Sequence, residues 1–172
     1  VENLDFEGPC VFEANHMSTL ETLFLPSIIQ PLRDTTFVVK RQLLGYPCLG
    51  PVLAAREPIA LGRANPREDL KLVMDDGQKI LGSGRSVIVF TQGTRRTNVE
   101  PGDFNSLAVK LARKANVPVV PIALKTDAWG EGSLIKDIGP INPKLPIHVR
   151  FGAPVEIKGA REEHTAIVAS IK

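Results

Sequence analysis

The sequence is poor in cysteine, in aromatic residues and in long apolar runs, and each shortage excludes a class of protein. Its two cysteines, Cys10 and Cys48, form neither a CxxC motif nor a Cys/His zinc spacing, so we expect a reducing compartment and no disulfide framework or metal site. No apolar stretch approaches the roughly 18 residues that a membrane-spanning helix needs. The chain also does not open with a basic segment followed by an apolar core, which is the pattern of a secretory signal peptide.

Positive charge is missing from the beginning of the chain. The first 30 residues contain five of the 19 acidic residues and none of the 21 Lys and Arg residues. The net charge of +2 is too weak by itself to indicate a nucleic-acid partner. Any anion-binding surface is therefore expected to come from residues after position 30.

The composition is that of a globular protein. Apolar residues make up 43% of the 172 residues and charged residues 23%, close to the averages of folded domains. We predict one domain over residues 1–172.

Strand-like and helical segments alternate along the chain, and the alternation predicts an α/β fold. Apolar, β-branched runs predict strands at 10–14, 35–39, 58–61, 86–90, 117–124, 147–151 and 155–157. Helices are expected from about 18 to 31 with an interruption at Pro26, from 65 to about 82, over 104–115 and from about 161, with short helical pieces in 42–55. Strands separated by helices pair in parallel through crossovers. We therefore predict a single domain with a mostly parallel central sheet flanked by helices.

The first candidate for chemistry is His16, which follows the first predicted strand. Open α/β sheets bind ligands at the carboxyl ends of their strands. Glu21 stands five residues later, so it reaches His16 only if the histidine lies in the turn before the helix. The pair would then act as a general base with a carboxylate that orients the imidazole. A purely structural alternative stays open, because Ser18-x-x-Glu21 is also a helix capping box.

The second candidate is the loop after the predicted strand 86–90. It contains Gly93, Thr94, Arg95 and Arg96, which together offer close backbone approach, a hydroxyl and two forked cations suited to phosphate. The alternative is a solvated turn in which the arginines serve solubility alone.

Two further strands end in a cation. Lys40 closes the predicted strand 35–39, and Arg63 follows the predicted strand 58–61. A parallel sheet brings such ends to one edge, so Lys40, Arg63 and Arg95 are expected to lie near one another.

Four ordered blocks resemble those of glycerolipid acyltransferases of the 1-acylglycerol-3-phosphate O-acyltransferase type. They are NHMSTLE at 15–21, a K…L…P…G stretch ending in PIALGR at 40–63, FTQGTRR at 90–96 and VPVVPI at 117–122. The family patterns are N-H-x4-D for the first block and F-P-E-G-T-R-S for the third. The chain departs from them at Glu21, which replaces Asp, and at Thr91, Gln92 and Arg96, which replace Pro, Glu and Ser.

The resemblance implies an acyltransferase of phospholipid biosynthesis. A fatty acyl group would pass from acyl-CoA or acyl-ACP (acyl carrier protein), used as a substrate with no cofactor, to a lysophospholipid hydroxyl. His16 would be the general base and Glu21 would orient it. The acceptor's phosphate would be held by Arg63, Gly93, Thr94 and Arg95, with Lys40 as a further contact.

Two alternatives to the transferase remain, and the lipid substrate raises the question of a membrane. The same fold could bind a lipid or anion without catalysis, or hydrolyse acyl thioesters with the same base. A serine hydrolase is excluded by the absence of a G-x-S-x-G motif.

The resemblance implies work at the cytoplasmic face of a membrane, peripherally or through an anchor. Because the first residue is Val, we expect a fragment that lacks an upstream anchor.

Overall fold

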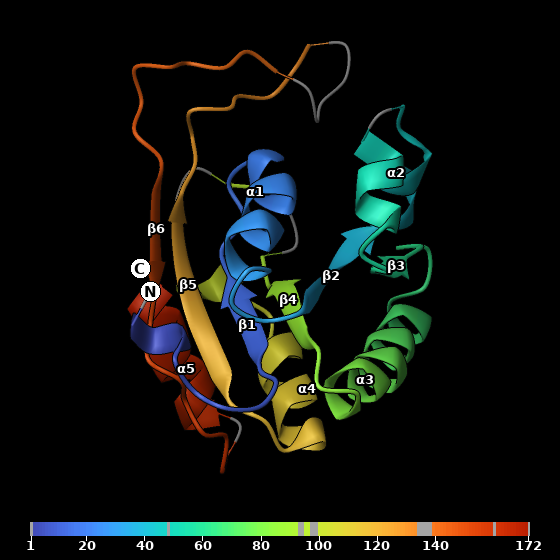
Figure 1. Cartoon of the computed structure of the whole chain (residues 1–172), viewed down its shortest axis with the longest axis vertical. Helices are drawn as coiled ribbons and strands as arrows, with labels where there is room; N and C mark the ends of the chain where they lie inside the picture. Colours follow the sequence, from blue (N-terminus) through green and yellow to red (C-terminus); the bar gives the residue numbers. More distant parts are fainter. Residues whose placement is uncertain are drawn as a thin grey trace.

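The computed structural model describes residues 2–47, 49–92, 95–96, 100–133, 139–159 and 161–171. Its centre is a six-stranded sheet in the order β3-β2-β4-β1-β5-β6 (Figure 1). The strands are β1 (Val11–Ala14), β2 (Thr35–Lys40), β3 (Ile59–Leu61), β4 (Ser86–Phe90), β5 (Val119–Lys125) and β6 (His148–Phe151). All neighbours pair in parallel except β6, which runs antiparallel to β5. The predicted α/β fold with a mostly parallel sheet is confirmed.

Five α-helices connect or follow the strands in the described part of the chain. They are α1 (Leu20–Ile29), α2 (Leu49–Ala54), α3 (Pro66–Gly82), α4 (Leu107–Ala115) and α5 (Arg161–Ile171), and three 3-10 turns lie at Glu2–Leu4, Arg41–Gly45 and Pro101–Asp103. The start of α3 shows how the sequence sets a boundary, because the Asn65 side chain accepts a hydrogen bond from the N–H of Arg67 at 3.1 Å. Among these residues, no helix has both the length and the apolar character needed to cross a bilayer.

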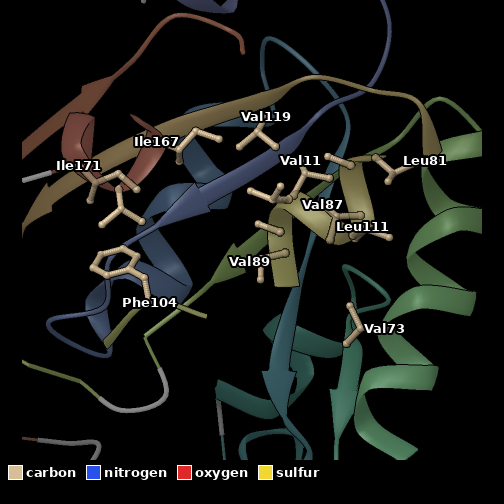
Figure 2. Close-up of a cluster of buried hydrophobic side chains, with 14 of the residues drawn as sticks. Val11, Val73, Leu81, Val87, Val89, Phe104, Leu111, Val119, Ile167 and Ile171 are labelled. Atoms are coloured by element: carbon tan, nitrogen blue, oxygen red, sulfur yellow. The ribbon is translucent and has the colours of Figure 1, made fainter. Parts of the chain in front are cut away.

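The two faces of the sheet bury separate hydrophobic clusters. On β1, Val11 packs in the cluster that α3, α4 and α5 cover, which is drawn in Figure 2. Its neighbour Phe12 points to the other face and packs with residues of α1 and α2. Successive side chains of a strand alternate between faces, so each inner strand buries side chains on both sides. The continuous apolar runs in the sequence reflect this burial on two faces.

Helices α3 and α4 approach each other closely at Gly77. A Cβ built on Gly77 would lie 2.8 Å from Cδ2 of Leu111, closer than a methyl group allows. Gly77 therefore lets α4 pack against α3 on this face of the sheet.

Three predicted elements differ in the structure. The strand predicted at 155–157 is wrong, because Val155 forms only an isolated bridge with Val119. The next antiparallel pair toward residue 157 would need the N–H of Val117, which instead donates to the carbonyl of Ala112 near the end of α4 at 3.1 Å. The predicted helix 104–115 begins only at Leu107. Pro26 does not interrupt α1, which continues to Ile29.

Candidate active site

The site begins where β1 ends, and Asn15 fixes this end to β5. The side chain of Asn15 is fully buried. Its Nδ2 donates to the carbonyl of Leu124 at 2.8 Å, and its Oδ1 accepts from the N–H of Leu124 at 2.7 Å. This two-point bridge supplies a sheet-like contact just beyond the last β1–β5 pair, so the backbone that carries His16 has a fixed place.

His16 and Glu21 form the hydrogen-bonded pair predicted from their spacing. Nδ1 of His16 lies 2.6 Å from Oε2 of Glu21. His16 stands in the turn before α1, as the contact requires, and Glu21 is in the first turn of the helix, where the helix dipole favours a carboxylate. Because an ionised carboxylate only accepts hydrogen bonds, Nδ1 is the donor and Nε2 carries the lone pair.

The other oxygen of Glu21 satisfies the backbone of the same turn. Its Oε1 accepts from the N–H groups of Met17 at 2.8 Å and Ser18 at 3.0 Å, and from the hydroxyl of Thr126. The contact with Ser18 is one half of a capping box, while the Ser18 hydroxyl has no partner in the part of the chain that the structure describes. The two interpretations of Glu21 therefore combine, since one carboxylate serves both the turn and the histidine.

The imidazole of His16 is also fixed by stacking. The ring of Phe90 lies 4.6 Å from it, centroid to centroid, with an interplanar angle of 29°. The His16 side chain is 21% exposed, whereas Glu21 is completely buried. A histidine held by its Nδ1 and by one face of its ring keeps its remaining edge available to a substrate.

Gln92 and Arg96 attach the loop after β4 to His16. Oε1 of Gln92 accepts from the N–H of His16 at 2.7 Å, and the N–H of Arg96 donates to the carbonyl of His16 at 2.8 Å. Gln92 is buried, and within the described residues its Nε2 has no hydrogen-bond partner. A neutral amide therefore accepts the same bond here that a carboxylate would accept.

Lys40, Arg63 and Arg95 line one pocket together with His16. This cationic pocket, as we call it, has a volume of about 170 Å³. Its cations come from the carboxyl ends of three strands: Lys40 closes β2, Arg63 follows β3 and Arg95 lies in the loop after β4. The predicted convergence is therefore present in the structure. The other two predicted phosphate contacts, Gly93 and Thr94, lie outside the described residues.

Specific hydrogen bonds hold two of these cations, Arg63 through its backbone and Arg95 through its side chain. Arg63 has a left-handed φ of 60°, which is unfavourable for a residue with a side chain. The Asp69 carboxylate in the first turn of α3 holds this conformation by accepting from the N–H groups of Gly62 at 3.1 Å and Arg63 at 2.8 Å. Arg95 donates from Nη1 to the hydroxyl of Thr19 at 2.6 Å.

An apolar groove of about 520 Å³ adjoins the cationic pocket. The two share Leu61, Arg63, Asn105 and Leu107 in their walls. The groove extends between α3 and α4 past Leu70 and Val73, and Leu70 is 42% exposed. A charged pocket thus opens beside an apolar surface, an arrangement that suits an amphiphilic ligand.

A second buried carboxylate, Glu13, lies on the same face of β1 as Val11, the face that α4 and α5 cover. Neither of its oxygens has a hydrogen-bond partner among the described residues. The nearby Thr91 hydroxyl offsets only part of the cost of burying the charged form of the carboxylate. Burial raises the pKa of the Glu13 carboxyl from its ordinary 4.5 to about 7. Nδ1 of His164 on α5 lies 4.0 Å away, too far for a hydrogen bond.

Sequence reasoning missed the contact between Thr126 and Glu21. Thr126 directly follows β5, and the same strand-end rule that selected Lys40 and Arg63 applies to it. In the described ranges, no group of three or more His, Cys, Asp or Glu side chains is placed to hold a metal ion.

A family model described as Acyltransferase matches residues 1–125. The chain belongs to the acyltransferase family. The matched segment carries His16, Glu21, Lys40, Arg63 and Arg95, so the family resemblance inferred from the four sequence blocks is confirmed.

The chain is also similar in sequence to individual acyltransferases. A 1-acyl-sn-glycerol-3-phosphate acyltransferase from Pseudomonas aeruginosa is 40% identical over 123 residues, which cover 72% of this chain and 46% of that protein. The chloroplastic 1-acyl-sn-glycerol-3-phosphate acyltransferase BAT2 from Brassica napus is 34% identical over 128 residues, covering 72% of this chain and 35% of that protein. The chain therefore spans less than half the length of these relatives.

The fold of the chain is shared with a solved structure. The crystal structure of the 1-acyl-sn-glycerophosphate (LPA) acyltransferase PlsC from Thermotoga maritima matches with a TM-score of 0.65 and 22% sequence identity. The match covers 99% of this chain and 66% of the other. The common fold thus includes β6 and α5, which lie beyond the segment matched by the family model.

Proposed function

We propose that this acyltransferase transfers a fatty acyl group from acyl-CoA or acyl-ACP to a free hydroxyl of a lysophospholipid such as 1-acylglycerol-3-phosphate. The observation that carries the proposal is the position of His16. Glu21 holds its Nδ1, and its ring lines the same pocket as Lys40, Arg63 and Arg95. A base and an anion-binding group thus lie within the reach of one small molecule. The names of the two relatives support 1-acylglycerol-3-phosphate as the acceptor.

The proposed chemistry needs one base. Nε2 of His16 takes the proton from the acceptor hydroxyl as its oxygen attacks the thioester carbonyl carbon. The tetrahedral intermediate then breaks its C–S bond, and the imidazolium returns the proton to the leaving thiolate. An ester and a free thiol result, and His16 ends neutral. Glu21 stabilises the imidazolium throughout and keeps the proton of Nδ1 in place.

The cationic pocket would position the acceptor. Arg63 and Arg95 offer forked donors to phosphate oxygens and Lys40 adds a compact charge. Gly93 and Thr94 are proposed as further phosphate contacts from the sequence. Binding the phosphate beside His16 converts attack by the hydroxyl into a reaction within one complex, which raises its rate by positioning. The neighbouring apolar groove has the lining that an acyl chain requires.

The substrates lead to a proposal for location. A lysophospholipid and its product reside in a bilayer, so we propose that the protein acts at a membrane surface on its cytoplasmic face, peripherally or anchored. Basic residues near anionic headgroups contribute about 1 kcal/mol each, and all 21 Lys and Arg residues follow position 30. Partners are then the acceptor lipid and the acyl-CoA or acyl-ACP donor, with no nucleic acid or cofactor proposed.

An acyl-transfer assay tests this function. The chain is incubated with acyl-CoA or acyl-ACP and several lysolipids, and both the released thiol and the acylated lipid are measured. We expect equal amounts of the two products, and a loss of at least about a hundredfold in His16→Ala. His148→Ala is a matched control, because His148 is exposed on β6 and outside the cationic pocket.

Each alternative has its own signature in this assay. Release of thiol together with free fatty acid, in place of acylated lipid, would indicate hydrolysis instead of transfer. Lysolipid binding without any thiol release would indicate a binding module. Unchanged transfer by His16→Ala would refute the role of His16.

A further inference from the structure

Thr126 contacts the pair from a distant part of the chain. It is fully buried directly after β5, and its hydroxyl donates to Oε1 of Glu21, 105 residues away in sequence. We propose that Thr126 is a positioning residue, which turns the Glu21 carboxylate so that Oε2 faces Nδ1 of His16. The proposal rests on the proposed function of His16 as a base.

The place of Thr126 is fixed by the sheet. Asn15 bridges the N–H and carbonyl of Leu124, two residues earlier. The N–H of Trp129 donates to the carbonyl of Thr126 at 3.3 Å on the other side. The ends of β1 and β5 therefore fix the position of the Thr126 hydroxyl relative to His16. Because its backbone is held on both sides, this hydroxyl meets Oε1 of Glu21 from a fixed direction.

Glu21 needs this additional contact because of its length. The family pattern has Asp at this place, and Glu adds one methylene with one more rotatable bond. Two of the donors to Oε1 are the N–H groups of Met17 and Ser18, which belong to the same local turn. The Thr126 hydroxyl approaches from another strand, so it restricts the rotation that the local donors leave open.

Thr126 also influences how readily the pair binds a proton. A hydrogen bond donated to a buried carboxylate stabilises its charge, and the Thr126 hydroxyl also sets which way the carboxylate of Glu21 faces. The other charged side chains around the pocket are Lys40, Arg63, Arg95 and Glu131. A change at Thr126 leaves these groups in place, so a change in the pH profile of the rate reports the Glu21–His16 pair.

The test compares variants that differ in the hydroxyl. Thr126→Val is nearly isosteric and lacks it, Thr126→Ala lacks it without new bulk, and Thr126→Ser retains it. We expect both variants without the hydroxyl to lose about tenfold to a hundredfold in kcat with little change in KM. The pH profile of kcat should change in both, and Thr126→Ser should restore kcat and the profile.

A matched control removes a buried hydroxyl elsewhere. Thr36 is fully buried on β2, and its hydroxyl donates to the carbonyl of Arg56 at 2.7 Å. Thr36→Val should lower stability without moving the pH profile. In a Glu21→Ala background, Thr126→Val should have little further effect on kcat, because the group through which it acts is gone.

A measurement independent of activity separates this proposal from the proposed function. ¹⁵N NMR of the His16 ring reports which nitrogen carries the proton and at which pH the ring titrates. We expect both signals to change in Thr126→Val and Thr126→Ala and to stay as in the wild type in Thr126→Ser. If the wild-type chain transfers no acyl group, the proposed function fails while the NMR comparison still tests Thr126. Unchanged His16 signals in the two variants without the hydroxyl, or a change in Thr126→Ser that equals theirs, would overturn the proposal.

Discussion

Glu13 makes the stability of this protein depend on pH in an unusual direction. Its carboxyl has an ordinary pKa of 4.5, and burial raises that pKa to about 7 in the folded chain. Between these values the folded state holds a proton that the unfolded state has released. The free energy of unfolding should therefore fall as the pH rises from about 4.5 to 7 and stay level above, as far as Glu13 contributes.

The size of the effect follows from the shift. A displacement of about 2.5 pKa units at about 1.4 kcal/mol each amounts to about 3 kcal/mol. Glu13→Gln keeps the shape of the protonated side chain and removes the titration. The variant should match the wild type near pH 4 and be more stable by about 3 kcal/mol near pH 8.

Urea unfolding of both proteins across pH 4 to 8 provides the test. The difference between the two curves cancels every other titrating group. As a control of opposite sign, the Gly159 N–H donates to Glu163 and lowers the pKa of its carboxyl below the ordinary 4.5. In a urea series extended below pH 4, the stability of Glu163→Gln relative to the wild type should therefore fall as the pH rises from that lowered pKa to 4.5 and stay level above. If the difference in unfolding free energy between wild type and Glu13→Gln does not vary with pH, the reasoning is refuted. Ionising Glu13 would then cost the folded state no stability.

Three further predictions concern the pocket and the helix contact. Gln92→Glu keeps an acceptor for the His16 N–H but adds negative charge to the pocket, so the KM for a phosphate-bearing acceptor should rise about tenfold in steady-state kinetics; an unchanged KM would contradict this. Arg63→Gly relieves the strain of the left-handed backbone and removes a cation from the pocket. Thermal unfolding should show a gain in stability of about 1 kcal/mol, while the KM for the acceptor rises. A loss of stability would mean that the contacts of the Arg63 side chain contribute more than its backbone strain costs. Gly77→Ala places a methyl against Leu111 and should lower stability by about 1 to 3 kcal/mol in urea without altering KM, whereas a stability equal to wild type would show that Leu111 moves aside freely.

Local pattern was sufficient for most elements but not for their exact extents. The Asn65 cap at the start of α3 depends on neighbours in sequence, so it was predictable. The strand predicted at 155–157 failed because a strand also needs a partner with free N–H groups, and the N–H of Val117, which would face residue 157, is bonded to Ala112. Phe104 likewise fits the helical spacing of the residues after it, yet it pairs with Gln92 across a loop.

The candidate site was predictable to the extent that it follows strand ends. His16, Lys40, Arg63 and Arg95 converge because parallel strands bring their carboxyl ends to one edge. Thr126 obeys the same rule, but its hydroxyl reaches Glu21 only through the placement of β5 beside β1.

The sequence by itself determined the types of elements, the parallel sheet and the residue types available for a base and for a phosphate. These depend on periodicity, on turn chemistry and on spacings of a few residues. Only the tertiary structure decided that Thr126 reaches Glu21 from the end of β5, that Gln92 binds the backbone of His16, and that Glu13 is buried without a hydrogen-bond partner among the described residues. Each of these facts depends on which strands lie side by side, and strand order is set by packing over long separations that no local pattern encodes.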